Sequence, residues 1–217
     1  MTEHYVVHHG HAACSLGVMH EGYLPDFLMF ANTIEVTQGV RLMPPVSLPE
    51  ERKWVQNLAK RKQSNVVFAV LVHEPSADGH TYRYIGHTGI HAIKWPDGTA
   101  VTGTLLGNSK NWLQGYGTEA KLLLLFHAFQ MLGLRKLTSE VKAFNARSLG
   151  HLLKCGYRIV GRYAKQDYHY GSYVDRILLE VFREDWEPIW DAYQATRTLP
   201  KLTDEQRKLV GKETGLA

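Results

Sequence analysis

Residues 112–126 read Trp-Leu-Gln-Gly-Tyr-Gly-Thr-Glu-Ala-Lys-Leu-Leu-Leu-Leu-Phe. This pattern is typical of a glycine-rich turn that opens a buried helix, which we expect over residues 118–132, because residues 122–126 are continuously apolar. Gly115 and Gly117 allow positive φ angles and let a ligand approach the backbone closely. The helix start presents free N–H groups and partial positive charge, which suit a phosphate group. Taken alone, the loop is also compatible with an ordinary connection before a core helix.

The composition indicates one large folded domain. The chain has 217 residues, of which 44% are hydrophobic, enough for a sizeable core. Its longest apolar run is far shorter than the roughly 20 residues that cross a bilayer, and its first residues lack the order of a signal peptide. We therefore expect no membrane partner. Cys14 and Cys155 stand too far apart to form a metal or redox motif. A reducing cytoplasm is the simplest location.

The charge balance is mildly basic, with a formal net charge of +4 and a pI of about 9.0. A basic cluster contributes much of it: Arg52, Lys53, Lys60, Arg61 and Lys62. The spacing of this cluster fits the solvated face of an amphipathic helix. No aromatic-plus-basic RNA motif accompanies it, so we expect no nucleic-acid partner. A mildly basic protein also attracts anionic small molecules, phosphorylated cofactors included.

The elements that we expect alternate between strands and helices without an internal repeat. Strands are predicted over 13–19, 65–73, 82–93, 99–106, 137–141, 157–163 and 174–182. Helices are predicted over 24–31, from a cap at Ser47 to about 62, over 118–132 and over 145–154. Turns are expected at 75–80 and 95–98.

These elements give one domain with two appendages. Residues 1–12 are rich in histidine (His4, His8, His9 and His11) and have no clear pattern, so we expect a flexible segment. No carboxylate or cysteine stands at ligand spacing, so we predict no metal site there. The folded domain is expected over 13–183, and 184–217 read as an amphipathic extension with a charged end.

Several short motifs follow one another in an order that resembles the GNAT acetyltransferase superfamily. Within it, the chain is most similar to the branch of ribosomal-protein N-terminal (alanine/serine) acetyltransferases. The motifs lie at 84–89, 105–108, 112–120, 144–148, 154–157 and 170–175, and the likeness covers about residues 13–183. The resemblance implies an α/β (α+β) fold with a mixed, mostly antiparallel sheet that splays open at the cofactor cleft and is flanked by helices.

The same resemblance implies acetyl-CoA as cosubstrate and names the residues that would receive it. Backbone N–H groups of the loop would hold the pyrophosphate, from Gln114, Gly115, Tyr116, Gly117 and Thr118. The N–H of Leu105 or Leu106 would form a small oxyanion pocket for the thioester carbonyl. Asn145 would bind the pantetheine arm, and Ser148 would place a hydroxyl near the sulfur. Asn145 is also a natural cap for the helix that follows it.

The chain departs from the family at the positions of the usual acid and base. Leu152 stands where many relatives have a tyrosine acid, and Val101 stands where others have a glutamate base. The wider superfamily favours Gln or Arg at position 112, whereas an aromatic such as Trp112 is usual in this branch. Ser148 is our candidate proton donor, and the alternative for its hydroxyl is a bond to its own backbone.

The candidate bases are His87 and His91, on the strand expected beside the cofactor strand, because histidine titrates near neutrality. The alternative for each is an ordinary packed or surface histidine. Tyr163 and Tyr168 are further candidate acids.

Without a strong carboxylate base, the site should favour acceptors that are already neutral. At pH 7 roughly one α-amine in ten is neutral, against well under one lysine in a thousand. We therefore predict an N-acetyltransferase that acts by direct attack in a ternary complex. Its acceptor is a protein N-terminus or a small-molecule amine, bound by segments 24–62 and 163–173.

Two other functions and one assembly are compatible with parts of the sequence. A non-catalytic acyl-CoA-binding or sensing module is the main alternative, because Leu152 and Val101 remove two usual catalytic groups. A nucleoside-triphosphate site is disfavoured, because no Gly-Lys-Ser/Thr follows the loop. The aromatic tail near residues 186–193 could dock on its own domain or on a second copy, which would give a homodimer.

Overall fold

The computed structural model describes residues 4–40, 44–76 and 79–215. Eight strands form one sheet in the order β1-β2-β3-β4-β5-β6-β8-β7, and every neighbouring pair except β5–β6 is antiparallel. The strands are β1 Val6–His8, β2 Ser15–Val18, β3 Val66–Ser76, β4 Gly79–Lys94, β5 Thr99–Leu106, β6 Lys136–Lys142, β7 Arg158–His169 and β8 Ser172–Phe182. The predicted fold class, a mixed and mostly antiparallel sheet flanked by helices, is confirmed.

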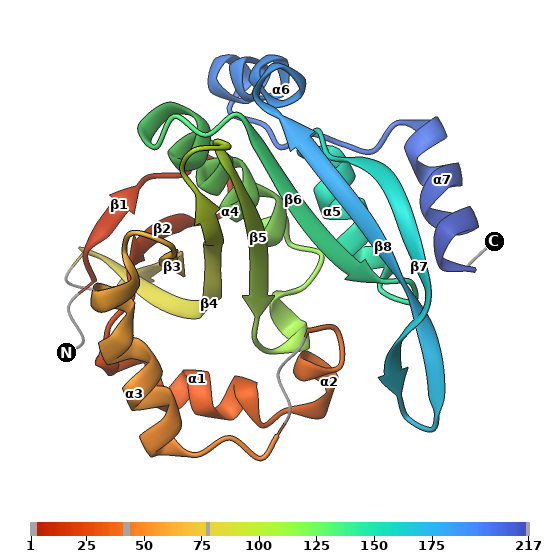
Figure 1. The fold of residues 1–217 in the computed structure, drawn as a ribbon. Helices are drawn as coiled ribbons and strands as arrows, with labels where there is room; N and C mark the ends of the chain where they lie inside the picture. Colours follow the sequence, from red (N-terminus) through yellow and green to blue (C-terminus); the bar gives the residue numbers. More distant parts are fainter. Residues whose placement is uncertain (1–3, 41–43, 77–78, 216–217) are drawn as a thin grey trace.

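Helices cover both faces of the sheet (Figure 1). One face carries α1 Leu24–Ala31, α2 Ile34–Thr37 and α3 Leu48–Leu58; the other carries α4 Tyr116–Phe126, α5 Ala146–Lys154 and α6 Arg183–Thr196, and α7 Asp204–Thr214 lies outside α5. Short 3-10 turns occupy Glu21–Tyr23, Ala59–Arg61 and Ser109–Asn111. Each face has its own apolar core, because side chains alternate across a strand: Ile85 joins the core under α4, and Tyr84 joins the core under α1.

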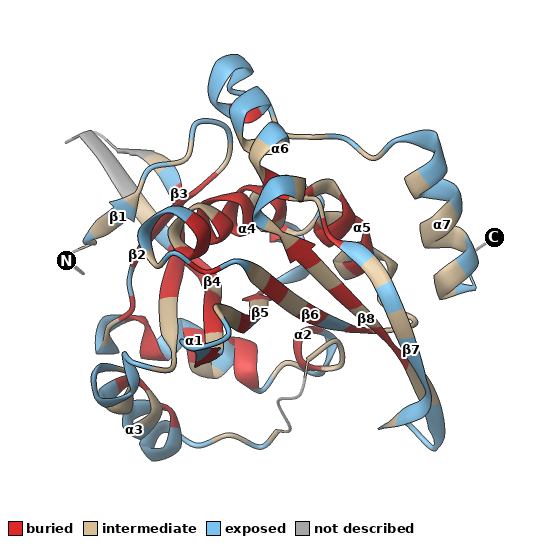
Figure 2. Ribbon diagram, turned by 45° about the horizontal axis from the view of Figure 1, so that its top comes forward, coloured by how far each residue is buried: buried red, intermediate tan, exposed pale blue. Residues whose placement is uncertain are grey.

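The helix α4 runs through the centre of the larger core, and Figure 2 shows it buried over most of its length. It starts at Tyr116, two residues before the predicted start, with Gly115 as its N-cap at φ +88°. Gly115 therefore adopts the positive φ angle that the sequence led us to expect. Gly117 does not, because it already lies inside the first helical turn. A π-helical turn, His127–Met131, continues α4 up to Gly133.

The backbones of β5 and β6 pair over only three positions. Their parallel register runs from Thr99 opposite Lys136 to Val101 opposite Thr138. Beyond these pairs the strands diverge, as Figure 1 shows on the side where α2 lies. The Thr102 carbonyl still accepts a hydrogen bond from the Ser139 hydroxyl at 3.1 Å, and from Gly103 onward this edge of β5 faces an opening instead of a neighbouring strand.

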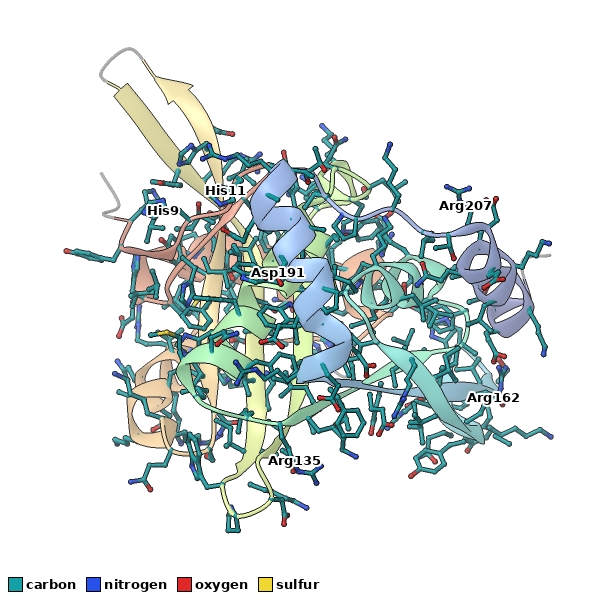
Figure 3. All side chains as sticks on the ribbon, turned by 90° about the horizontal axis from the view of Figure 1, so that it is seen from above. His9, His11, Arg135, Arg162, Asp191 and Arg207 are labelled. Atoms are coloured by element: carbon teal, nitrogen blue, oxygen red, sulfur yellow. The ribbon has the colours of Figure 1, made fainter. Side chains whose placement is uncertain are left out.

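Both terminal segments of the described chain pack on the domain. The segment expected to be flexible contributes β1, which pairs with β2, and the His11 ring packs at a tilt against Tyr193 of α6, with 5.5 Å between ring centroids (Figure 3). In the C-terminal extension, α7 contacts α5 through the Gln206 side chain, which donates to the Leu153 carbonyl at 3.2 Å. The turn predicted over 75–80 is the β3–β4 hairpin, and residues 77 and 78 lie outside the described residues.

The helices of the described residues are too short or too polar to span a lipid bilayer. Within the same part of the chain, His, Cys, Asp and Glu side chains do not gather in threes as a metal site would need.

Candidate active site

A cavity of about 1300 Å³ opens where β5 and β6 diverge. Its walls come from α1, α3, β4, β5, the glycine loop, β6 and α5. Among the residues expected to bind the cofactor or act in catalysis, nine line it: His87, His91, Leu105, Leu106, Gly115, Gly117, Thr118, Asn145 and Ser148. Gln114 and Tyr116 do not. Gln114 points to solvent, and Tyr116 packs on the main core.

The glycine loop is held against the end of β5. The Trp112 indole N–H donates to the Leu106 carbonyl at 3.1 Å, and the Asn111 amide donates to the Gly107 carbonyl at 3.1 Å. Leu113, at φ +63° and 90% exposed, lines the cavity beside Trp112. These bonds fix where α4 begins, and its first turn faces the cavity.

A cation stands next to this loop. The Arg147 guanidinium lies over the Trp112 ring, with its central carbon 3.4 Å from the ring centroid. Partial burial lowers its pKa, and Glu35 opposes that effect. Stacking leaves the edge of a guanidinium available for bidentate contact with phosphate oxygens. Arg147 was not among the predicted site residues, although it lies between Asn145 and Ser148 in the motif at 144–148.

The helix α5 presents its N-terminus to the same cavity. The Asn145 side chain accepts a hydrogen bond from the Ser148 backbone N–H at 3.0 Å, so Asn145 caps this helix. The Ser148 hydroxyl has no hydrogen-bond partner among the described residues, its own backbone included. It is therefore available to a bound molecule.

His87 lies directly opposite Leu105 in the β4–β5 register. Its ring packs between Phe27 and Trp54, at 5.0 and 5.3 Å between centroids, and its Nδ1 lies 3.4 Å from the Tyr84 hydroxyl. Burial, with a smaller contribution from His91, lowers the pKa of His87 to about 4. The ring is thus neutral at pH 7 and has a lone pair that can accept a proton.

His91 lies on the same face of β4, four residues on, opposite Val101. Burial lowers its pKa as well, and the next largest cause is Lys121. Its ring lies above Gly89, where a Cβ would come within 2.7 Å of the His91 Nε2. The absence of a side chain at Gly89 therefore makes room for this ring at the cavity wall.

The wall across from β5 is aromatic and acidic. Phe27, Trp54, Glu50 and Glu51 all line it. Glu51 is only 5% exposed, and burial followed by the neighbouring Glu50 raises its pKa. This wall lies within the predicted acceptor segment 24–62, but the individual residues are set by how α1 and α3 pack against β4.

The second predicted acceptor segment contributes differently. Four of its tyrosines are exposed and do not line the cavity: Tyr163, Tyr168, Tyr170 and Tyr173. Asp167 lines the cavity and is paired with Arg176, whose Nε donates to it at 2.9 Å; Arg176 also pairs with Glu140 at 2.7 Å.

The comparison with protein-family models identifies the family. Residues 18–158 match the model of the acetyltransferase (GNAT) domain. The chain belongs to this family. It is therefore an acyltransferase with acetyl-CoA as donor, and the resemblance to the GNAT superfamily is confirmed. A search of curated protein sequences gives no match.

Solved structures share the fold of this GNAT acetyltransferase at low identity. RimJ of Mycobacterium smegmatis in complex with CoA-disulfide is 15% identical, with a TM-score of 0.72 over 92% of this chain and 95% of that one. Spermidine N-acetyltransferase of Vibrio cholerae in complex with CoA and spermine is 16% identical, with a TM-score of 0.70 over 80% and 98%. A putative ribosomal-protein-serine acetyltransferase of Vibrio cholerae is 20% identical, with a TM-score of 0.60 over 84% and 99%.

The residues at the cavity fit acetyl-CoA. The unpaired stretch of β5 offers backbone groups to an extended pantetheine arm, and Asn145 and Ser148 border the same space. The start of α4 and the Arg147 guanidinium supply N–H donors and positive charge for phosphates. The pantetheine arm and the phosphates therefore each have chemically matched groups along the cavity.

Proposed function

We propose that this GNAT acetyltransferase transfers acetyl to a primary amine by direct attack in a ternary complex. The observation that carries the proposal is the single cavity that joins the β5–β6 opening to the wall of Phe27, Trp54 and Glu51, with His87 at the junction. Such a cavity admits a thioester from one side and an amine from the other. No transfer of the acetyl group to the protein is then needed.

The two cysteines favour direct attack of the amine on acetyl-CoA over a mechanism in which a cysteine thiol first takes the acetyl group. Both thiols are buried, Cys14 at 6% and Cys155 at 0% exposure. Burial raises the pKa of Cys14 well above its ordinary value and that of Cys155 to about 12. A buried thiol with a raised pKa is inert as a nucleophile.

In this mechanism each neighbouring group has one task. The neutral His87 ring takes the proton that the amine loses, directly or through water. The backbone at Leu105 and Leu106 polarises the thioester carbonyl. The Ser148 hydroxyl donates a hydrogen bond to the sulfur, and Asn145 positions the pantetheine arm while it caps α5.

The acceptor that we propose is the α-amine of a peptide or protein. Val101 and Leu152 occupy the positions at which many relatives have a carboxylate base and a tyrosine acid. His87 can take the proton of an amine that has already attacked the thioester, but it is too weakly basic to deprotonate a free ammonium before attack. The enzyme then depends on amines that are neutral in solution. The acidic wall at Glu50 and Glu51 attracts cationic acceptors, so a small polyamine is the second candidate. The fold is shared with structures named for both kinds of acceptor.

The test is thiol release from acetyl-CoA with matched acceptors at pH 7. One set holds short peptides with a free α-amine and no lysine; a second holds the same peptides with a blocked N-terminus and one lysine; a third holds polyamines. We expect fastest release with the first set, and mass spectrometry should locate the acetyl group on the α-nitrogen. Faster release with lysines would overturn the α-amine assignment. Tight acetyl-CoA binding without release in any set would instead favour the acyl-CoA-binding module.

Two organisational predictions are retained alongside this function. We infer a cytoplasmic enzyme, because both cysteines are reduced and buried. We also retain two proposals: the division into residues 1–12, 13–183 and 184–217, which limited proteolysis can test, and the homodimer, which size measurements in solution can test.

A further inference from the structure

Lys121 is a buried cationic residue of the largely apolar helix α4. It lies in the second turn of α4 and is 1% exposed, yet it lines the cavity described above. Among the described residues its ammonium has no hydrogen bond and no carboxylate partner; the Tyr157 ring lies beneath it, 6.0 Å from Nζ to the centroid. A buried, unpaired charge is costly to folding, so its presence in a cleft points to a role with a ligand.

The groups around Lys121 do not neutralise it. His91 faces it from β4, His151 and Lys154 from α5, and Cys155 and Tyr157 from the segment that follows α5. Burial lowers the pKa of Lys121 to about 8, so it is mostly protonated at pH 7. Burial and the nearby cations lower the pKa of His151 to about 3, and burial raises that of Tyr157. Both of these neighbours are neutral.

A second unpartnered nitrogen lies on the same wall. The His151 ring is hydrogen-bonded to the Arg147 backbone, but its Nε2 is buried without a partner within the described chain. His151 and Lys121 both line the cavity, as do Thr102 and Ser139, the first residues beyond the last paired positions of β5 and β6. Two nitrogens without partners at this point indicate a place for a polar or anionic ligand atom.

The reaction generates one anion in this cavity. When an amine attacks the thioester, a C–N bond forms, the C–S bond breaks and its electron pair goes to sulfur. Ser148 offers the sulfur a neutral hydrogen bond, but a hydroxyl brings no charge. Lys121 is a buried cation that lines the same cavity as Ser148, whereas Arg147 stacks on Trp112 at the glycine loop.

We propose that the Lys121 ammonium stabilises the coenzyme A thiolate as it leaves and gives it a proton. This inference rests on the proposed function. The sulfur receives the proton from Nζ, the proton lost by the amine leaves through His87, and neutral Lys121 regains a proton from solvent. A model thiol has a pKa near 8.5, close to that of Lys121, and an acid matched to its leaving group transfers a proton with little penalty in either direction.

The test measures the thiol of bound coenzyme A, which needs no acceptor. Thiolate absorbance is followed against pH for free coenzyme A and for its complex with the wild type, Lys121→Met, Lys121→Arg and the control Lys208→Met, a substitution on the exposed face of α7. We expect the wild type and the control to lower the thiol pKa by about one unit, which keeps it close to that of Lys121. Lys121→Met should remove this shift, and Lys121→Arg should keep it, because arginine retains the charge.

Measurements of turnover distinguish the effect of the Lys121 charge from the effect of its proton. Lys121→Met and Lys121→Arg should both lower kcat by about 10²-fold or more, with KM for acetyl-CoA changed less than about threefold, because arginine does not release a proton at neutral pH.

The outcomes that contradict the inference are distinct from failure of the proposed function. If the wild type did not bind coenzyme A, both the proposed function and the role of Lys121 would be wrong. Binding with an unshifted thiol in the wild type would overturn the Lys121 role alone, and this comparison needs no variant to fold. Preference for succinyl-CoA over acetyl-CoA that disappears in Lys121→Met would also overturn it, because Lys121 would then recognise an acyl carboxylate.

Discussion

The Glu119 carboxylate, in the first turn of α4, accepts a hydrogen bond from the hydroxyl of Tyr193 in α6. The same carboxylate accepts backbone N–H groups from His11 and Ala12 at 2.8 Å and from Cys14 at 2.6 Å. Glu119 is fully buried. One side chain therefore ties the N-terminal segment and the C-terminal extension to the helix whose start faces the cavity.

Replacing Glu119 should destabilise the whole fold. Glu119→Gln exchanges one acceptor oxygen for an N–H₂ group that faces backbone donors, so the free energy of unfolding should fall by about 3 kcal/mol or more. Tyr193→Phe removes the bond that the hydroxyl donates to Glu119 and the one that it accepts from the His11 N–H at 2.9 Å, and should cost about 1.5–3 kcal/mol. Urea unfolding measures both, and the exposed Asp191→Asn is the control, expected within about 0.5 kcal/mol of wild type. Equal stability of Glu119→Gln and wild type would contradict the tie.

Removing the Arg147 guanidinium should weaken acetyl-CoA binding. Arg147→Ala should raise KM for acetyl-CoA about tenfold and leave kcat within about threefold, because the lost contact is to phosphates that do not react. Arg147→Lys should recover only part of the loss, since lysine neither stacks on Trp112 nor forms a fork. Steady-state kinetics with dephospho-CoA thioesters would show which phosphate is involved. A KM unchanged in Arg147→Ala would rule out this contact.

Ser148 and Asn145 should separate chemistry from binding. Ser148→Ala should lower kcat about tenfold with little change in KM, because its hydroxyl meets the sulfur as charge develops. Asn145→Ala should instead raise KM and lower the free energy of unfolding by about 1 kcal/mol, as the cap of α5 is lost. Kinetics and thermal unfolding distinguish the two. A Ser148→Ala enzyme with full kcat would exclude this residue from the reaction.

The pH dependence of kcat/KM should follow the ionisation of the acceptor amine and not that of a histidine with an ordinary pKa. Because burial lowers the pKa of His87 to about 4, the ring is neutral and able to accept a proton at every pH above about 5. With a peptide α-amine, kcat/KM should therefore rise with pH toward roughly 7.7–8.0 as the amine loses its proton. Rates from pH 5 to 8 test this. A rise centred near 6.5 that disappears in His87→Gln would show an unperturbed imidazole.

The buried Lys121 should lower stability at neutral pH. Its pKa is lower in the folded state than in the unfolded state, so folding disfavours the protonated form; the cost is full below about pH 8 and fades as pH rises toward 10.5. Lys121→Met should accordingly be more stable than wild type at pH 7, by up to about 3 kcal/mol, and the difference should shrink by pH 10. Urea unfolding at the two pH values gives both numbers. Equal stability at pH 7 would mean that the ammonium has a partner.

Local patterns in the sequence predicted most elements of this fold. The strand Thr99–Leu106 and the helix Leu24–Ala31 have their predicted limits, and Ser47 caps α3 in a capping box with Glu50. Period, caps and turn residues act within a few positions of each other, so they are visible in the sequence. The short strand β1, the single-turn α2 and the polar α7 were missed, because three or four residues carry no period and α7 lacks a buried face of its own.

The sequence by itself determined the apolar helix after the glycine loop, the order of the strands along the chain and the motifs that the family shares. Only the tertiary structure brought Arg147 onto Trp112, His87 between Phe27 and Trp54, and Lys121 to the point where β5 leaves β6. These arrangements join residues about 20 to 60 positions apart. Their geometry depends on how helices pack across a sheet, which no local pattern encodes.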